Sequence, residues 1–147
     1  MMAMNVSGLV SFTAPQTAVW QLLTTPEQLC GCLPGLQTWQ PLSDRRFELE
    51  VVWQFAPNGH KPIPITIEWT RLQPPITLDT TAVLTFNQQQ IEINGRFSLS
   101  PSATSPQQTD LHFELAIDSP NSFIDQLARN LAPRLIDNYF VCLKAQL

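Results

Sequence analysis

The sequence predicts an α+β fold in which a curved antiparallel sheet of about seven strands wraps round one long C-terminal helix. Two observations predict this class. The middle of the chain alternates apolar and polar residues with a period of two, which is typical of strands that have one buried and one wet face. The last part of the chain carries one long amphipathic segment, and this segment is the large apolar partner that a one-sided sheet requires.

The strands are predicted from the alternation and from the turn residues between the alternating stretches. Turn signals such as Pro57-Asn58-Gly59 and Asn87-Gln88-Gln89 separate these stretches at lengths typical of hairpins. The stretches cover residues 47–55, 63–70, 76–86, 91–99 and 111–118, with further strands expected at 6–12 and, at an edge, 36–42. The apolar parity of these strands should face the C-terminal helix.

Two short helices are predicted between the first two strands. Pro15 suits the first position of one of them. The second begins at Thr25-Pro26-Glu27-Gln28, which has the form of a capping box, and it stops at Pro34-Gly35. The long helix runs from about Asn121 to the C-terminus, with Ser119 or Asn121 as its cap. Pro133 lies inside it and should kink it, because proline removes the hydrogen bond to the Arg129 carbonyl.

Length and composition bound the class of protein. The chain has 147 residues, which suits one domain spanning residues 1–147. A net charge of -4 with 8 Lys+Arg argues against nucleic acid as a partner. No stretch is long and apolar enough for a transmembrane helix, so we do not expect an integral membrane protein. The 3 Cys have no framework spacing, and we expect free thiols and a cytoplasmic location.

The sequence offers little catalytic chemistry, and we assign no catalytic residue, no metal site and no cofactor. His60 lies in a turn, where it is either solvated or at the mouth of a pocket, and His112 has the outward parity of its strand. Glu48 and Glu50 also have the outward parity and are interpreted as part of a solvated face. Phosphate loops, dinucleotide fingerprints and zinc helix motifs do not occur.

A curved sheet that grips one helix leaves space beside the helix, where an apolar ligand can bind. Aromatic side chains gather on the inward parity of the strands and suit a cavity wall. Arg129 either meets the polar head of a ligand, if the kink turns it inward, or faces water. The predicted ligand-binding residues are Leu33, Trp53, Phe55, Trp69, Phe86, Phe97, Phe113, Leu127, Arg129 and Leu131.

Several short motifs carry a resemblance to a known family. The motifs that carry it are Ser7-Gly8, Ala14-Pro15, Val19-Trp20, Leu23, Pro26-Glu27, Leu29, Leu33-Pro34-Gly35, Pro74-Pro75 and Phe140. Through these motifs the chain resembles the START and Bet v 1-like (SRPBCC) superfamily, whose fold is the helix-grip fold, and within it the carbon-monoxide-dehydrogenase CoxG-like family. The sequence departs from that family at residues 85–91, where a glycine-rich strand is usual.

The resemblance implies a binding module more than a catalyst. Members of the superfamily hold lipids, quinones, polyketides and similar molecules beneath the C-terminal helix, so we expect a soluble binding or carrier protein for such a hydrophobic small molecule. Two alternatives stay open: an enzyme of the cyclase, dehydratase or hydrolase kind on the same fold, and an accessory adaptor for a molybdenum hydroxylase. The resemblance is also compatible with a peripheral membrane or oxidoreductase partner, and the oligomeric state stays open.

Overall fold

The computed structural model describes residues 2–53 and 61–147 of the chain, and its elements follow the predicted order. One strand is followed by two short helices, a run of strands and a long helix. These elements are β1 (Met2–Phe12), α1 (Gln16–Leu23), α2 (Pro26–Gly31), β2 (Leu36–Ser43), β3 (Arg46–Val51), β4 (Ile63–Gln73), β5 (Thr77–Phe86), β6 (Gln89–Pro101), β7 (Thr109–Ser119) and α3 (Ser122–Ala145).

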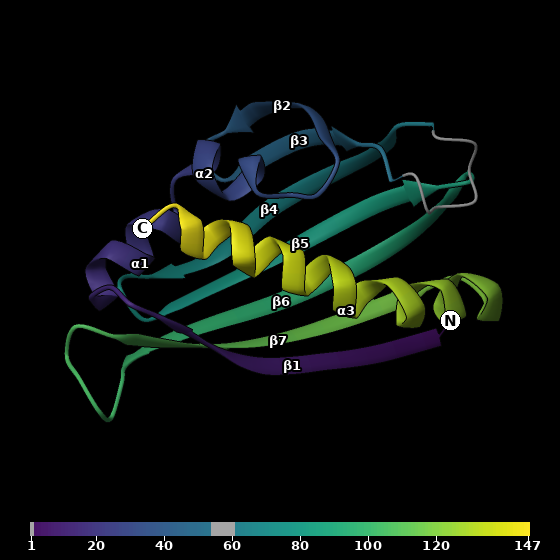
Figure 1. The fold of residues 1–147 in the computed structure, drawn as a ribbon. Helices are drawn as coiled ribbons and strands as arrows, with labels where there is room; N and C mark the ends of the chain where they lie inside the picture. Colours follow the sequence, from purple (N-terminus) through teal and green to yellow (C-terminus); the bar gives the residue numbers. More distant parts are fainter. Residues whose placement is uncertain (1, 54–60) are drawn as a thin grey trace.

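The strands form one 7-stranded antiparallel sheet in the order β1-β7-β6-β5-β4-β3-β2. β1 and β2 are the two edges, and β1 pairs with β7 because the chain returns to its start after the last hairpin. Figure 1 shows α3 lying along one face of this sheet, with its C-terminal end beside α1 and α2. The predicted α+β helix-grip architecture is therefore confirmed.

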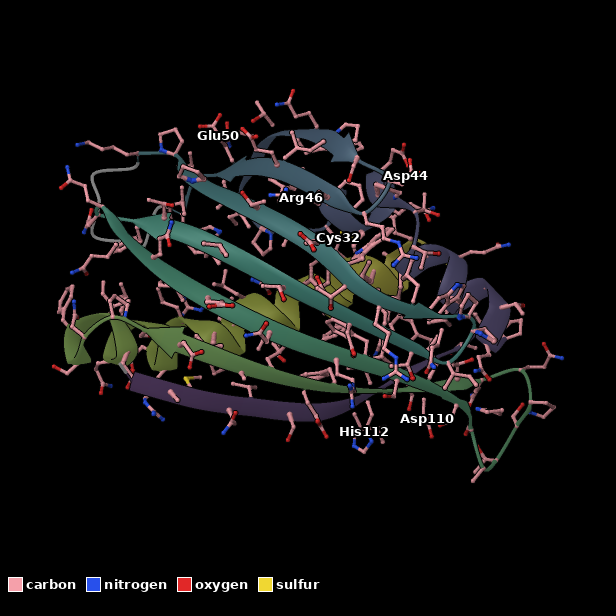
Figure 2. All side chains as sticks on the ribbon, turned by 180° about the vertical axis from the view of Figure 1, so that it is seen from behind. Cys32, Asp44, Arg46, Glu50, Asp110 and His112 are labelled. Carbon is pink, nitrogen blue, oxygen red and sulfur yellow. A yellow bond between two sulfur atoms is a disulfide. The ribbon has the colours of Figure 1, made fainter. Side chains whose placement is uncertain are left out.

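The alternation of the sequence appears directly as alternation of burial. In β3, Phe47, Leu49 and Val51 are buried, whereas the residues between them are exposed. Because successive side chains of a strand point to opposite faces, the buried set faces the core and the exposed set faces solvent. Figure 2 shows the solvent face, on which Arg46, Glu50 and His112 are labelled, and all three are exposed. The outward placement that the parity predicts for Glu50 and His112 is confirmed.

Two turns beside the sheet contain residues with positive φ. Asn87 and Gln88 both have positive φ, 49° and 65°, which is the backbone of a two-residue hairpin turn between β5 and β6. Gly35 has a φ of 74° directly before β2. A Cβ atom at Gly35 would overlap the carbonyl oxygen of Val52, so only glycine fits there.

The helix ends differ from one another in how they are capped. The Asn121 side chain accepts a hydrogen bond from the Ile124 N–H at 2.9 Å and so caps α3 as predicted. The capping box expected at Thr25 does not form, because the Thr25 hydroxyl instead donates to the Gln21 carbonyl at 2.6 Å. Pro26 does occupy the first turn of α2. α3 continues through Pro133 as one helix of 24 residues.

The core lies between the sheet, α1, α2 and α3, and it includes Phe140 and Leu143 in the last turns of α3. Trp69 lies in this core with its ring centroid 4.9 Å from that of Phe47. Side chains with almost no exposed surface include Phe12, Val19, Leu23, Phe47, Leu49, Val51, Ile63, Leu78, Leu111 and Leu143.

Candidate ligand-binding site

Two adjoining cavities lie between α3 and the inner face of the sheet. The first, which we call the front chamber, has a volume of about 100 Å³ and lies under the N-terminal half of α3. Its helix wall extends from Ile124 to Leu135. The opposite wall is formed by side chains from four neighbouring strands and from the short segment after β3. It comprises Trp53, Ile63, Leu84, Phe86, Ile91, Ile93 and Ile117.

The second cavity, the rear chamber, has a volume of about 190 Å³ and lies under the C-terminal half of α3. Leu135, Ile136, Tyr139 and Phe140 form its helix wall. The sheet and the segment after α2 form its remaining walls, with the side chains of Leu33, Pro34, Trp53, Ile65, Ile67, Ala82, Leu84, Ile93, Phe97, Phe113 and Leu115.

The polar atoms of these walls are engaged in hydrogen bonds within the protein. The Trp53 indole N–H donates to the Pro34 carbonyl at 2.8 Å, and the Tyr139 hydroxyl donates to the Leu29 carbonyl at 3.0 Å. Burial also raises the pKa of Tyr139 well above its ordinary value, so the phenol stays neutral. The described walls therefore present carbon to a ligand, because their two polar side-chain groups already have partners.

Part of the helix wall of the front chamber is only half-buried. Leu127, Leu131 and Leu135 follow one another at intervals of four residues and so share one face of α3. A bound apolar ligand would cover these half-buried leucines and remove their apolar surface from water. Removing apolar surface from water is favourable for binding.

Seven of the residues predicted to bind ligand line these chambers: Leu33, Trp53, Phe86, Phe97, Phe113, Leu127 and Leu131. Trp69 does not line either chamber, since its ring packs against Phe47 in the core. Phe55 lies outside the described residues, and so does His60.

Arg129 lies outside both chambers. Its guanidinium Nε donates to Asp125 Oδ2 at 2.7 Å, and its Nη2 approaches the Ala3 carbonyl at 3.4 Å. Nearly half of its side chain is exposed to solvent. The sequence leaves open whether Arg129 meets a ligand or faces water, and in the structure it points away from the cavity. Its contact with Ala3 connects α3 to the edge strand β1.

The sequence prediction missed most of the aliphatic wall. Leu84, Ile91, Ile93 and Leu135 line the chambers, and each follows the same periodicity as a residue that was selected. The parity of β5 and β6 and the four-residue spacing after Leu131 would have identified them. The prediction from the sequence relies mainly on aromatic side chains, although a cavity wall needs only apolar ones.

The expectation that all three cysteines are free thiols is wrong. Cys32, directly after α2, forms a disulfide with Cys142 in the last turns of α3, and their Cα atoms are 5.4 Å apart. The prediction failed because the partners are separated by 110 residues, and only the fold brings them together. Cys30 is a buried free thiol, and burial, with the nearby Glu27 carboxylate, raises its pKa to about 11.

Titratable groups do not converge on the chambers within the described chain. No group of three or more His, Cys, Asp and Glu side chains could hold a metal ion there. A wider hollow of about 540 Å³ lies on the solvent face of the sheet and includes Asp79 and Arg96. These two form an ion pair at 2.8 Å, and the hydrogen bond from Arg96 lowers the pKa of Asp79. This hollow is open and polar, so it does not suit an apolar ligand.

In the described residues, no helix has the length and apolar character needed to cross a membrane.

Comparison with known proteins supports the resemblance. Residues 8–60 match the family model of CoxG, a carbon monoxide dehydrogenase subunit. No curated protein matches the chain.

Solved structures match nearly the whole chain. A conserved protein from Geobacillus kaustophilus has a TM-score of 0.86 at 16% identity, over 97% of this chain and 94% of its own. A START superfamily protein from Mycobacterium smegmatis has a TM-score of 0.73 at 17% identity, over 97% and 95% of the two chains. Ara h 8.0201 has a TM-score of 0.74 at 9% identity, over 99% and 97%. The chain therefore has the helix-grip fold of the START and Bet v 1-like superfamily, and its residues 8–60 match the CoxG family.

Proposed function

We propose that this protein binds and carries a hydrophobic small molecule between the sheet and α3. The observation that supports the proposal is the pair of adjoining chambers, whose described walls are apolar and whose two polar side-chain groups are already hydrogen-bonded. Such concave, preformed and mostly apolar sites are typical of small-molecule binding.

Energetics favour an apolar occupant over a polar one. A polar ligand would lose its hydrogen bonds to water on entering walls made of carbon, and this loss costs about 1–3 kcal/mol for each group left unpaired. An apolar ligand gains about 25 cal/mol for each Å² removed from water. The site therefore selects for apolar surface.

The same walls argue for binding over catalysis. General acid–base chemistry needs a titratable group within hydrogen-bond reach of the reacting atoms. Among the described residues, Tyr139 is the titratable side chain in the chamber walls, and its hydroxyl is held by the Leu29 carbonyl. The Glu48, Glu50 and His112 side chains are exposed, on the other face of the sheet.

The match of residues 8–60 supports a second candidate function, that of an accessory protein for an oxidoreductase. These residues include the last part of β1 together with α1, α2, β2 and β3, and so contribute to both edges of the sheet and to the two short helices. Binding a ligand and serving an oxidoreductase are compatible roles.

Mass spectrometry tests the proposal. We expect native spectra of the purified protein to show extra mass that disappears on denaturation, and we expect the protein emptied of ligand to take up a fluorescent fatty acid. Failure of both experiments would contradict the proposed function.

Two tryptophan substitutions on the same helix make the uptake test specific to the cavity. Leu131→Trp enlarges a side chain of the front chamber, whereas Asn138→Trp adds the same ring at an exposed position of α3. Leu131→Trp should weaken uptake by about tenfold or more, which corresponds to a loss of about 1.4 kcal/mol. Asn138→Trp should bind as the unchanged protein does.

A further inference from the structure

The two chambers follow one another along α3. The front chamber begins at Ile124 and the rear chamber ends at Phe140. At 1.5 Å per residue, this part of the helix is about 24 Å long. Together the chambers therefore extend further along the helix than either chamber alone.

We call the place where the two chambers adjoin the waist. Trp53, Leu84, Ile93 and Leu135 line both chambers, so these four side chains surround the place where the chambers adjoin. They come from the segment after β3, from β5, from β6 and from α3.

The waist is held in place from several sides. The hydrogen bond from the Trp53 indole to Pro34 fixes one side, and Leu84, which is 7% exposed, projects from the middle of the sheet. Widening the waist would mean breaking that hydrogen bond or displacing a side chain of a central strand. A ligand that occupies both chambers must therefore be slim where it passes these residues.

The combined volume limits the size of the ligand. An engineered cavity of about 150 Å³ holds benzene, so a volume of about 300 Å³ for the two chambers together holds about a dozen carbon atoms. Neither chamber alone has room for the fused rings of a sterol. The shape and the volume thus agree on a ligand that is long, thin and of modest size.

We propose that the site takes a single unbranched alkyl chain of about a dozen carbons, threaded through the waist, and that it excludes fused-ring ligands. The proposal rests on the proposed function and narrows its ligand class. The polar head of such a ligand lies at the front chamber, beside the half-buried Leu127 and Leu131. Arg129 is hydrogen-bonded to Asp125 and does not line the cavity. The site therefore recognises the length of the ligand's alkyl chain and not the charge of the ligand's polar head.

Calorimetric titration with straight-chain alkanoic acids of increasing length, each below its micellar concentration, tests the proposal. Each added CH₂ group that enters the cavity should tighten Kd about fourfold. We expect this gain to continue to about twelve carbons and then to level off. The 1-alkanol of the limiting length should bind within about threefold of the acid, because the described walls hold no charged partner.

A cage-shaped acid tests the waist separately. Undecanoic acid and adamantane-1-carboxylic acid contain the same number of carbons but differ in width. Undecanoic acid should bind at least about tenfold more tightly. Equal binding of the two acids, or affinity that still rises well beyond the expected length, would overturn the proposal while leaving a binding function in place. Absence of binding for every acid and alcohol would instead contradict the proposed function.

A matched pair of substitutions places the length limit in the front chamber. Ala128→Phe fills that chamber, whereas Ala145→Phe adds the same ring at an exposed position near the end of α3. Ala128→Phe should move the levelling-off to chains shorter by about four carbons, and Ala145→Phe should leave it unchanged. An unchanged limit in a folded Ala128→Phe variant would overturn the proposal. If that variant does not fold, the length and width series on the unchanged protein decide the outcome.

Discussion

Gly35 is a single residue on which one wall of the site depends. Its φ of 74° and the overlap of any Cβ with the Val52 carbonyl exclude larger residues. Gly35→Ala should lower the free energy of unfolding by about 2 kcal/mol or more, because it adds strain in left-handed backbone and displaces a neighbouring strand end. Urea denaturation measures the effect.

Gly31 provides the control for that substitution. No atom lies within 4 Å of a Cβ built on it, and it ends α2 without positive φ. Gly31→Ala should leave stability unchanged or raise it by up to about 1 kcal/mol. A loss of the same size in both variants would show that the Gly35 conformation is not the cause.

Cys30 should be almost unreactive in the folded protein. Burial raises the pKa of its thiol to about 11 from 9.0, so little thiolate is present at pH 8. Labelling with a chromogenic disulfide reagent at pH 8 should be at least about a hundredfold slower than in urea. Because the folded state holds this proton more tightly, stability should also fall as the pH rises above about 9. Rapid labelling of the native protein would contradict the buried placement.

The N-cap of α3 is the clearest determinant at the scale of an element. Asn121 accepts from the Ile124 N–H and donates to Gln89 at 2.9 Å, so it joins the start of the helix to the start of β6. Asn121→Ala should lower the free energy of unfolding by about 1 kcal/mol. Asn138→Ala, at an exposed position of the same helix, should change it by less than about 0.5 kcal/mol. Thermal unfolding of both variants measures the loss of stability. Equal losses in the two variants would contradict a capping role for Asn121.

The disulfide links two further elements, α2 and α3. It closes a loop of 110 residues in sequence separation, which restricts the unfolded chain strongly. Replacing Cys32 and Cys142 together by Ser should lower the free energy of unfolding by about 2–4 kcal/mol. Reduction with dithiothreitol should have the same effect on the unchanged protein and none on the double variant. Identical urea midpoints with and without reductant would contradict the bond.

At the scale of the whole molecule, folding and ligand binding draw on the same inner face. Leu84 and Phe113 pack in the core and also line the chambers. A ligand present at a hundred times its Kd adds about 2.7 kcal/mol of stability by mass action. Undecanoic acid at that excess should therefore raise Tm by about 5–10 °C. Scanning calorimetry should show a smaller rise in Tm for Leu131→Trp and the full rise in Tm for Asn138→Trp. If saturating undecanoic acid does not raise the Tm of the unchanged protein, binding to the folded state is contradicted.

The sequence by itself determined the elements and their faces. The period of two in β3 to β7 predicts which side of each strand is buried, because successive side chains of a strand must point to opposite faces. Asn121 predicts the start of α3, because its side chain satisfies a free N–H of the first turn. These features are local, so a short stretch of residues is sufficient to specify them.

Only the tertiary structure decided how distant residues combine. The parity of Trp69 is the same as that of Phe97, yet Trp69 packs against Phe47 while Phe97 lines the rear chamber. Cys32 and Cys142 are bonded because α3 returns to α2 at the far end of the chain. The waist likewise needs residues from four separate segments at one point. Such contacts depend on the curvature of the sheet and on where α3 crosses it, and the local pattern of residues does not determine either.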